Sequence, residues 1–198
     1  MADFNDILGS NATNIQAVEL ISFQPTVRTQ SLSGRSQVRT FGGQLFSMKI
    51  TMPPLAEADL RKVYGFLVKQ KGGFSSFTIA PHNLTQVGGT QGTTEAMAAG
   101  TYSIGATSVT TIDSNEFAVG DVFKFSNHDK TYMVTACSGS TLSFEPGLLT
   151  QVTGGLLGDK IKSKADYFMT VRLDGDTFSY KQGNEGFGTI EFDAIEAV

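Results

Sequence analysis

One run of alternating side chains, residues 44–52 with the sequence QLFSMKITM, constrains the fold more than any other part of the chain. Apolar side chains recur at every second position from Phe46 to Met52, and Ser47, Lys49 and Thr51 stand between them. Successive side chains of a strand point to opposite faces of a sheet, so the run predicts a strand with one buried and one wet face. The chain must therefore build a core against one side of a sheet.

A second predicted strand, residues 36–41, precedes this run, and Gly42 and Gly43 separate the two. Two-residue turns between paired strands need positive φ, which glycine adopts readily, so we expect a hairpin with its turn at the glycines. Arg35 and Arg39 would lie on one side of this hairpin, because residues four apart in a strand point the same way. The planar fork of donors in arginine suits salt bridges to a neighbouring subunit, so both are candidate subunit-interface residues. A plain exposed sheet face and a phosphate-binding site are the alternatives.

The sequence predicts one helix, at about residues 55–71. Pro53 and Pro54 end the strand and suit the first turn of a helix, where a missing N–H has no consequence. Gly72 and Gly73 suit its C-terminal cap. Apolar side chains recur between these signals at helical spacing: Leu60, Val63, Tyr64, Leu67 and Val68. One face of the helix must therefore pack on a sheet.

Two glycine-rich segments, residues 82–100 and 153–160, bracket a series of short predicted strands. The 22 glycines and 15 phenylalanines of the chain also favour short strands and tight turns. We expect a mostly β fold: a β-sandwich with one flanking α-helix, made of residues 1–85 and 159–198, interrupted by a small barrel-like β-domain at residues 86–158. The first 14 residues are polar and lack periodicity, so we expect an arm that orders only on assembly.

Residues for catalysis or metal binding are sparse. The single cysteine, Cys137, excludes an internal disulfide framework and a cysteine-based zinc cluster, and we expect it to be a small buried side chain. Neither His82 nor His128 has a second ligand at metal-binding spacing. The segment DGD at 174–176 suggests calcium, but Phe178 occupies a ligand position, so we expect a hairpin turn there. No catalytic residue, cofactor or metal is predicted, although a carboxylate pair stays an open alternative.

The balance of 15 basic and 19 acidic residues gives a net charge of −4 and argues against nucleic acid as the main ligand. The first 14 residues lack the basic and apolar regions of a signal peptide. No apolar run is long enough to cross a membrane. We therefore expect a protein made in a cytoplasm, with no membrane partner.

The order of several motifs resembles that of distal tail proteins of long-tailed bacteriophages, including T5-like phages. "SGRSQVR" is followed by "GGQLFSMKITMPPL", an amphipathic helix and "GGFSSFTIAPHN". In the expected insertion, "AVGDVFKFSNHDKTYMVTA" and "LSFEPGLLTQV" resemble a recurrent phage-tail segment. The resemblance covers roughly residues 21–152, and it depends on the order of the motifs rather than on any one of them.

This resemblance implies a structural, non-enzymatic virion protein that is assembled in the host cytoplasm. Members of the family form a ring, typically of six copies, where the tail tube meets the tail tip or baseplate. The expected partners are other copies of the chain, the tail tube protein, hub or baseplate proteins and tail fibres, with DNA passing through the lumen without specific binding. Two alternatives stay open: a receptor- or carbohydrate-binding tail module, which the absence of tryptophan weakens, and a tail-associated hydrolase.

Overall fold

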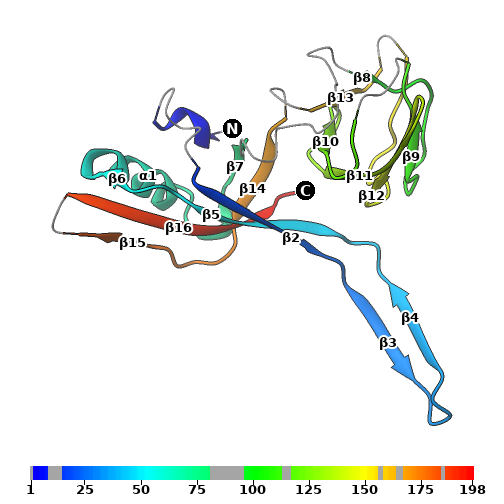
Figure 1. The fold of residues 1–198 in the computed structure, drawn as a ribbon, viewed down its shortest axis with the longest axis horizontal. Helices are drawn as coiled ribbons and strands as arrows, with labels where there is room; N and C mark the ends of the chain where they lie inside the picture. The colour runs from blue at the N-terminus through cyan, green and yellow to red at the C-terminus, as the bar shows by residue number, and fades with distance from the viewer. Residues whose placement is uncertain are drawn as a thin grey trace.

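The computed structural model describes residues 2–8, 15–80, 96–112, 117–155, 158–163, 167–183 and 186–198 of the 198-residue chain. The fold is mostly β with one flanking α-helix, as the sequence predicts (Figure 1). Its strands form an eight-stranded sheet, a six-stranded sheet and a two-stranded hairpin that projects away from both. The predicted mostly β class is therefore confirmed.

The eight-stranded sheet carries the larger of two hydrophobic cores. Along its main path the order is β1 (Ala2–Asp3), β7 (Ser76–Ile79), β14 (Met169–Leu173), β16 (Phe187–Glu196), β5 (Leu45–Thr51) and β2 (Ala17–Phe23), while β15 (Ser179–Gln182) and β6 (Leu55–Ala56) also pair with β16. In β5, Phe46, Met48 and Ile50 are buried and the side chains between them face outward, which confirms the predicted alternation. We call these two sides the core face and the outer face.

The helix α1 (Glu57–Lys69) lies within the predicted range and packs on the core face. Leu60, Val63 and Leu67 are buried, as the periodicity predicts. Val68, which the same periodicity also places on the apolar stripe, is 51% exposed. The buried stripe of the helix is therefore narrower than the sequence predicts. Tyr64 is half-buried at the edge of the stripe, where its ring packs edge-on against Phe178, just before β15, and against Tyr180 within β15.

The N-terminal residues do not form the expected arm. Residues 2–3 are β1, which pairs in parallel with β7, and the 3-10 turn η1 (Phe4–Asp6) follows. Phe4 is only 2% exposed and packs against Phe66, Phe77 and Phe192. One buried aromatic side chain outweighs the polar composition around it, since burying it removes a large apolar area from water. The expectation of an arm is wrong for residues 2–8, and its remainder at residues 9–14 lies outside the described residues.

The predicted hairpin turn at Gly42-Gly43 is also wrong. β4 (Ser36–Thr40) pairs with β3 (Thr26–Gln30), and β5 pairs with β2, so one long antiparallel ribbon runs from the sheet to a turn at residues 31–35. Gly42, at φ 76°, lies instead at the kink between the two ladders, next to Phe41, whose N–H donates to the Pro25 carbonyl oxygen at 3.2 Å. Proline and glycine can interrupt the pairing of two strands as readily as they form a hairpin turn, and the sequence alone does not distinguish an interruption from a turn.

The six-stranded sheet encloses the second core and contains most of the residues of the expected insertion. Its order is β8 (Ala96–Met97), β13 (Lys160–Lys162), β10 (Val122–Phe125), β11 (Thr131–Ser138), β12 (Thr141–Glu145) and β9 (Ser108–Thr110). β13 belongs to this sheet, which therefore continues past residue 158. A single bridge, Ala98 to Thr111, joins its two ends, so the sheet curls without closing as a full barrel.

Candidate functional site

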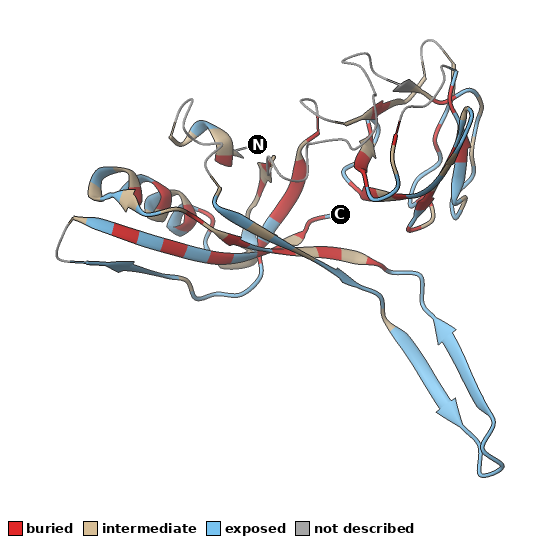
Figure 2. Cartoon of the chain, in the orientation of Figure 1, coloured by how far each residue is buried: buried red, intermediate tan, exposed pale blue. Residues whose placement is uncertain are grey.

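The most unusual feature of the molecule is the projecting hairpin, residues 24–43. We call this hairpin the arm; it is a different segment from the N-terminal arm that the sequence predicts for the first 14 residues. Every residue of β3 and β4 is exposed (Figure 2). An isolated two-stranded ribbon is marginally stable in water, and it gains little from its own side chains when both faces are wet. The arm therefore depends on the ladder of β2 and β5 that continues from it into the sheet.

The tip of the arm is a tight turn. The Ser31 N–H donates to the Arg35 carbonyl oxygen at 2.9 Å, and the Gly34 N–H donates to the Ser31 carbonyl oxygen at 2.9 Å. Gly34 has φ 79°, a conformation that side chains with a Cβ rarely adopt. Leu32 is fully exposed at this tip. The turn fixes the register that sets Val27 opposite Arg39.

The charge of the arm differs from that of the remaining chain. It contains Arg28, Arg35 and Arg39 and no acidic residue, so its net charge is +3. Since the whole chain carries −4, the remaining residues carry −4 − 3 = −7. None of the three guanidinium groups forms an ion pair with a described residue. The two predicted site residues, Arg35 in the turn and Arg39 in β4, thus share one exposed basic element.

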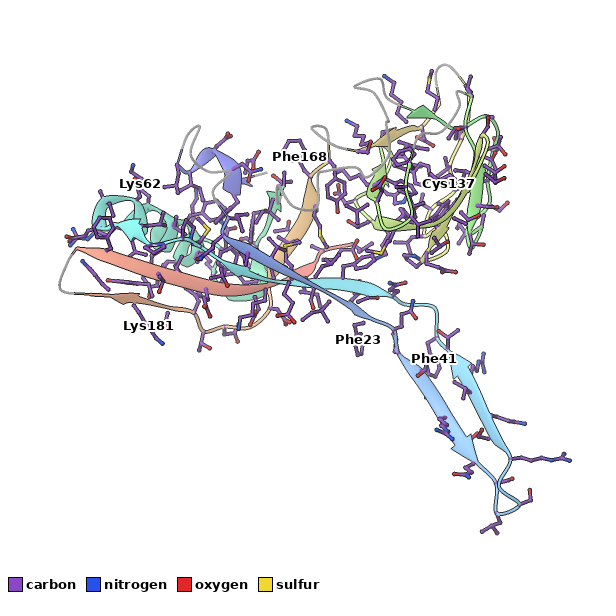
Figure 3. The ribbon with its side chains drawn as sticks, viewed as in Figure 1. Phe23, Phe41, Lys62, Cys137, Phe168 and Lys181 are labelled. Carbon is purple, nitrogen blue, oxygen red and sulfur yellow. The ribbon has the colours of Figure 1, made fainter. Side chains whose placement is uncertain are left out.

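Apolar side chains accompany this charge at the base of the arm. Phe23 and Phe41 are 61% and 64% exposed and lie beside the kink, one on each side of the ribbon, Phe23 at the end of β2 and Phe41 just after β4 (Figure 3). Phe23 lies opposite Leu45, and Ile21 lies opposite Ser47, whose other neighbour is Ile195. These positions alternate with the side chains on the core face of the same strands, so they form an apolar end of the outer face. Exposed aromatic groups of this kind are typical of protein contact surfaces.

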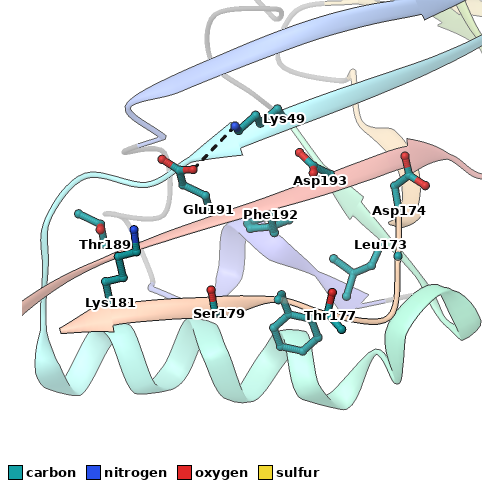
Figure 4. A pocket seen from close by; sticks show the side chains of 12 residues that line it. Lys49, Leu173, Asp174, Thr177, Ser179, Lys181, Thr189, Glu191, Phe192 and Asp193 are labelled. Carbon is teal, nitrogen blue, oxygen red and sulfur yellow. Dashed lines mark ion pairs between the residues drawn. The ribbon is translucent and has the colours of Figure 1, made fainter.

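The other end of the outer face is charged and hollowed (Figure 4). Lys49 and Glu191 are paired at 3.8 Å across β5 and β16. Asp193 lies next along β16, and the Asp174 N–H donates to its carbonyl oxygen at 2.9 Å. The carboxylates of Asp174 and Asp193 project to the same side, and neither has an ion-pair partner within 4 Å among the described residues.

A groove of about 330 Å³ lies beside these carboxylates. It exists because β14 and β15 do not pair with each other, as the predicted hairpin at residues 174–176 would require, but follow one another along the same side of β16. The connection between them bends away from β16 at Gly175 and leaves the groove open. Lys181 and Thr189 line its far end.

Two strands at the margin of the eight-stranded sheet, β2 and β15, are also open on one side. β2 pairs only with β5, and β15 pairs only with β16, within the part of the chain that the structure describes. Both strands are largely exposed. An edge strand presents unpaired N–H and C=O groups, which another chain can pair with. These edges lie on opposite sides of β16 and differ in sequence, so a contact between them would join unlike surfaces.

A buried ion pair joins the two sheets. Glu196, at the end of β16, is fully buried and accepts hydrogen bonds from Lys130 Nζ, from the Thr131 N–H at 2.5 Å and from the Phe46 N–H at 3.2 Å. Burial lowers the pKa of Lys130, and the bond to Glu196 opposes this effect. A signal was present in the sequence, because Glu196 continues the alternation of Ile190, Phe192 and Ala194 onto the core face.

His128 is half-buried and is held by hydrogen bonds at the margin of the second core. The Leu149 N–H donates to Tyr132 Oη at 3.1 Å, which leaves the tyrosine proton for His128 Nε2 at 2.7 Å. His128 Nδ1–H then donates to Asn127 Oδ1 at 2.5 Å. Burial lowers the pKa of His128 although Asp159 raises it, and burial raises the pKa of Tyr132 to about 12. This arrangement favours a neutral imidazole that fastens a loop.

Other chemical candidates are few among the described residues. No three His, Cys, Asp or Glu side chains in these ranges lie close enough to hold a metal ion. Cys137 is partly rather than fully buried, and burial raises the pKa of its thiol. His82 lies outside the described residues. No described helix is long and apolar enough to cross a membrane.

No protein-family model matches the chain, and no curated protein matches it.

Proposed function

We propose that this chain is a structural, non-catalytic subunit that forms a ring, of six copies, at the distal end of a phage tail tube. The ring would join the tube protein to hub or baseplate proteins and their fibres, and DNA would pass through its lumen without specific binding. The proposal combines the order of the sequence motifs with one structural observation, which is the arm.

The arm supports an assembly function because it contributes nothing to either core of its own chain. It exposes Val27, Val38 and Phe41 together with unpaired arginines. A surface element that exposes apolar and charged groups without contacts is suited to a partner. Its position on one side of the sheet, with a different open edge on the other, suits head-to-tail contacts, which close into rings when the rotation allows.

The test is the mass and shape of the purified protein. Light scattering after gel filtration at protein concentrations from about 1 to 100 μM should give a closed oligomer, and negative-stain images should give rings with a central hole. Antibodies against the chain should label the tip of the tail in intact particles of its phage.

A chain that stays monomeric over this range and is absent from the particles would refute the proposal. A monomer that binds glycans would favour the receptor-binding alternative, and turnover of peptidoglycan would favour the hydrolase.

A further inference from the structure

We propose that the arm of one copy lies across the outer face of the sheet of a second copy and places its arginines at Asp174 and Asp193. The inference depends on the proposed ring, since it names the two surfaces that would meet between neighbouring subunits. It begins from the arm, whose three guanidinium groups have no carboxylate partner within the described residues.

Charge identifies the partner of the arm. The arm carries +3 and the remaining residues carry −7, so the arm of one copy is opposite in net charge to the rest of a second copy. Complementary charge steers association and fixes register between partners. A basic, slightly apolar ribbon with no acidic residue is therefore suited to another copy of the same chain.

The topology keeps the arginines of the arm away from Asp174 of the same chain. The arm extends from β2 and β5, which lie on one side of β16, whereas Asp174 follows β14 on the other side. Figure 1 shows the ribbon pointing away from β15 and from the start of the β14–β15 connection. The contact must then form between copies, and it joins two unlike surfaces, as a ring requires.

The dimensions agree with this placement. The arm from Gln24 to Leu32, at about 3.4 Å per residue, reaches about 27 Å. The six strands on the main path of the sheet, at about 4.8 Å between neighbours, span about 24 Å. An arm that enters at the edge of a neighbouring sheet can therefore extend its tip as far as the groove.

The receiving surface offers what the arm lacks. Asp174 and Asp193 come from adjacent chain segments, project to the same side and have no ion-pair partner among the described residues (Figure 4). A planar guanidinium can bind such carboxylates with two donors at once. The groove beside them leaves room for the long arginine stem, and the apolar end of the outer face can receive the valines and phenylalanine of the arm.

Two charge-reversal variants test the pairing. The arm variant is Arg35→Glu with Arg39→Glu, and the groove variant is Asp174→Lys with Asp193→Lys. Each alone sets like charges against each other, so its self-association should weaken at least about tenfold in sedimentation velocity at 0.1 M salt. The matched control is Lys62→Glu with Lys69→Glu on α1, which changes the net charge by the same amount as the arm variant and should assemble like the unaltered chain.

Mixing the two variants gives the decisive result. The reversed arm of one meets the reversed groove of the other, and the native arm meets the native groove, so an equimolar mixture should recover assembly in alternation. All four substitutions in one chain should also recover it. Raising salt from 0.1 to 1 M shortens the screening length from about 10 to about 3 Å and should weaken the unaltered assembly.

The outcomes separate this inference from the proposed function. If the unaltered chain forms rings and the arm variant does so equally well, or if mixing restores nothing, the pairing is wrong and the ring stands. If the unaltered chain never associates, the proposed function itself is wrong. A salt-dependent complex with a 60-base-pair DNA duplex that only the arm variant loses, without any effect on assembly, would assign the arm to nucleic acid and overturn the inference. Circular dichroism melting of each variant checks that the fold is retained.

Discussion

Replacing Lys130 by methionine should lower the free energy of unfolding far more than a typical surface substitution does, because it leaves the buried carboxylate of Glu196 without a counter-charge. The Glu196 carboxylate would keep two backbone N–H donors, from Phe46 and Thr131, and lose its only cation. Removing one partner of a buried pair destabilises proteins by about 3–5 kcal/mol. Methionine preserves most of the apolar stem that covers the Phe46 ring, where Lys130 Nζ lies 5.2 Å from the ring centroid. Lost packing therefore contributes little to the expected change.

The informative comparison is the double variant Lys130→Met with Glu196→Gln. It removes both charges, and the amide oxygen can still accept one of the two backbone N–H groups. The remaining unsatisfied donor costs about 1–3 kcal/mol. The double variant should therefore be more stable than the single Lys130→Met variant by about 2 kcal/mol, although it carries one more substitution.

Urea unfolding followed by circular dichroism measures both changes. With a slope of about 2 kcal/mol per molar urea, the single substitution should lower the midpoint by about 1.5–2.5 M, and the second should restore about 1 M. If Lys130→Met costs less than about 1 kcal/mol, or if adding Glu196→Gln lowers stability further, the buried pair does not hold the two sheets together as described. Lys62→Met, at an exposed surface pair on α1, is the matched control and should change the midpoint by less than about 0.5 M.

Three further predictions address other parts of the fold. Phe4→Ala should cost about 3–5 kcal/mol in urea unfolding, because Phe4 fills the core against three rings, whereas a mobile N-terminus would give no change. Gly188→Ala should lower the melting temperature by several degrees, since its Cβ would lie 2.5 Å from Leu60 Cδ2 and 2.6 Å from the Lys181 carbonyl oxygen; an unchanged melting curve would contradict this packing. The folded-state pKa of His128 lies below its ordinary value of 6.5, so its contribution to stability should be full above pH 6.5 and should fall as the pH drops through 6.5 towards that lower pKa. The variant His128→Gln should flatten this pH dependence of the melting temperature between about pH 8 and 5. An equally steep dependence in the variant would exclude His128 as its source.

The sequence predicted the elements whose signal is local. The alternation in residues 44–52 located β5 and its buried face, and the repeat from Leu60 to Leu67 located α1. Burial follows directly from these periods, because a strand or helix that must cover a core has only one way to turn its apolar side inward. The mostly β class followed from many such short segments.

The sequence failed where pairing decides the structure. Gly42-Gly43 carries the composition of a turn, yet the strand before it pairs with β3 and the strand after it pairs with β2 and β16. Likewise, the connection at Asp174 joins two strands that pair with β16 and not with each other. Long-range partners are chosen by the whole core, so a local turn signal cannot fix them. The groove on the outer face was missed for the same reason.

The arm also explains why Arg35 and Arg39 could be found as candidates while their structural setting was mistaken. A segment that packs against its own core shows a period, because one face must be apolar. The strands β3 and β4 have one valine and one arginine on each face instead, since Val27 lies opposite Arg39 and Arg28 lies opposite Val38. Neither face of the arm is apolar enough to pack against a core. The backbone hydrogen bonds of an isolated ribbon stabilise it only marginally, so this composition does not serve the stability of the arm itself. This composition supports the proposal that the arm contacts a partner, and a monomer whose arm amides exchange as slowly as those of β5 would contradict it.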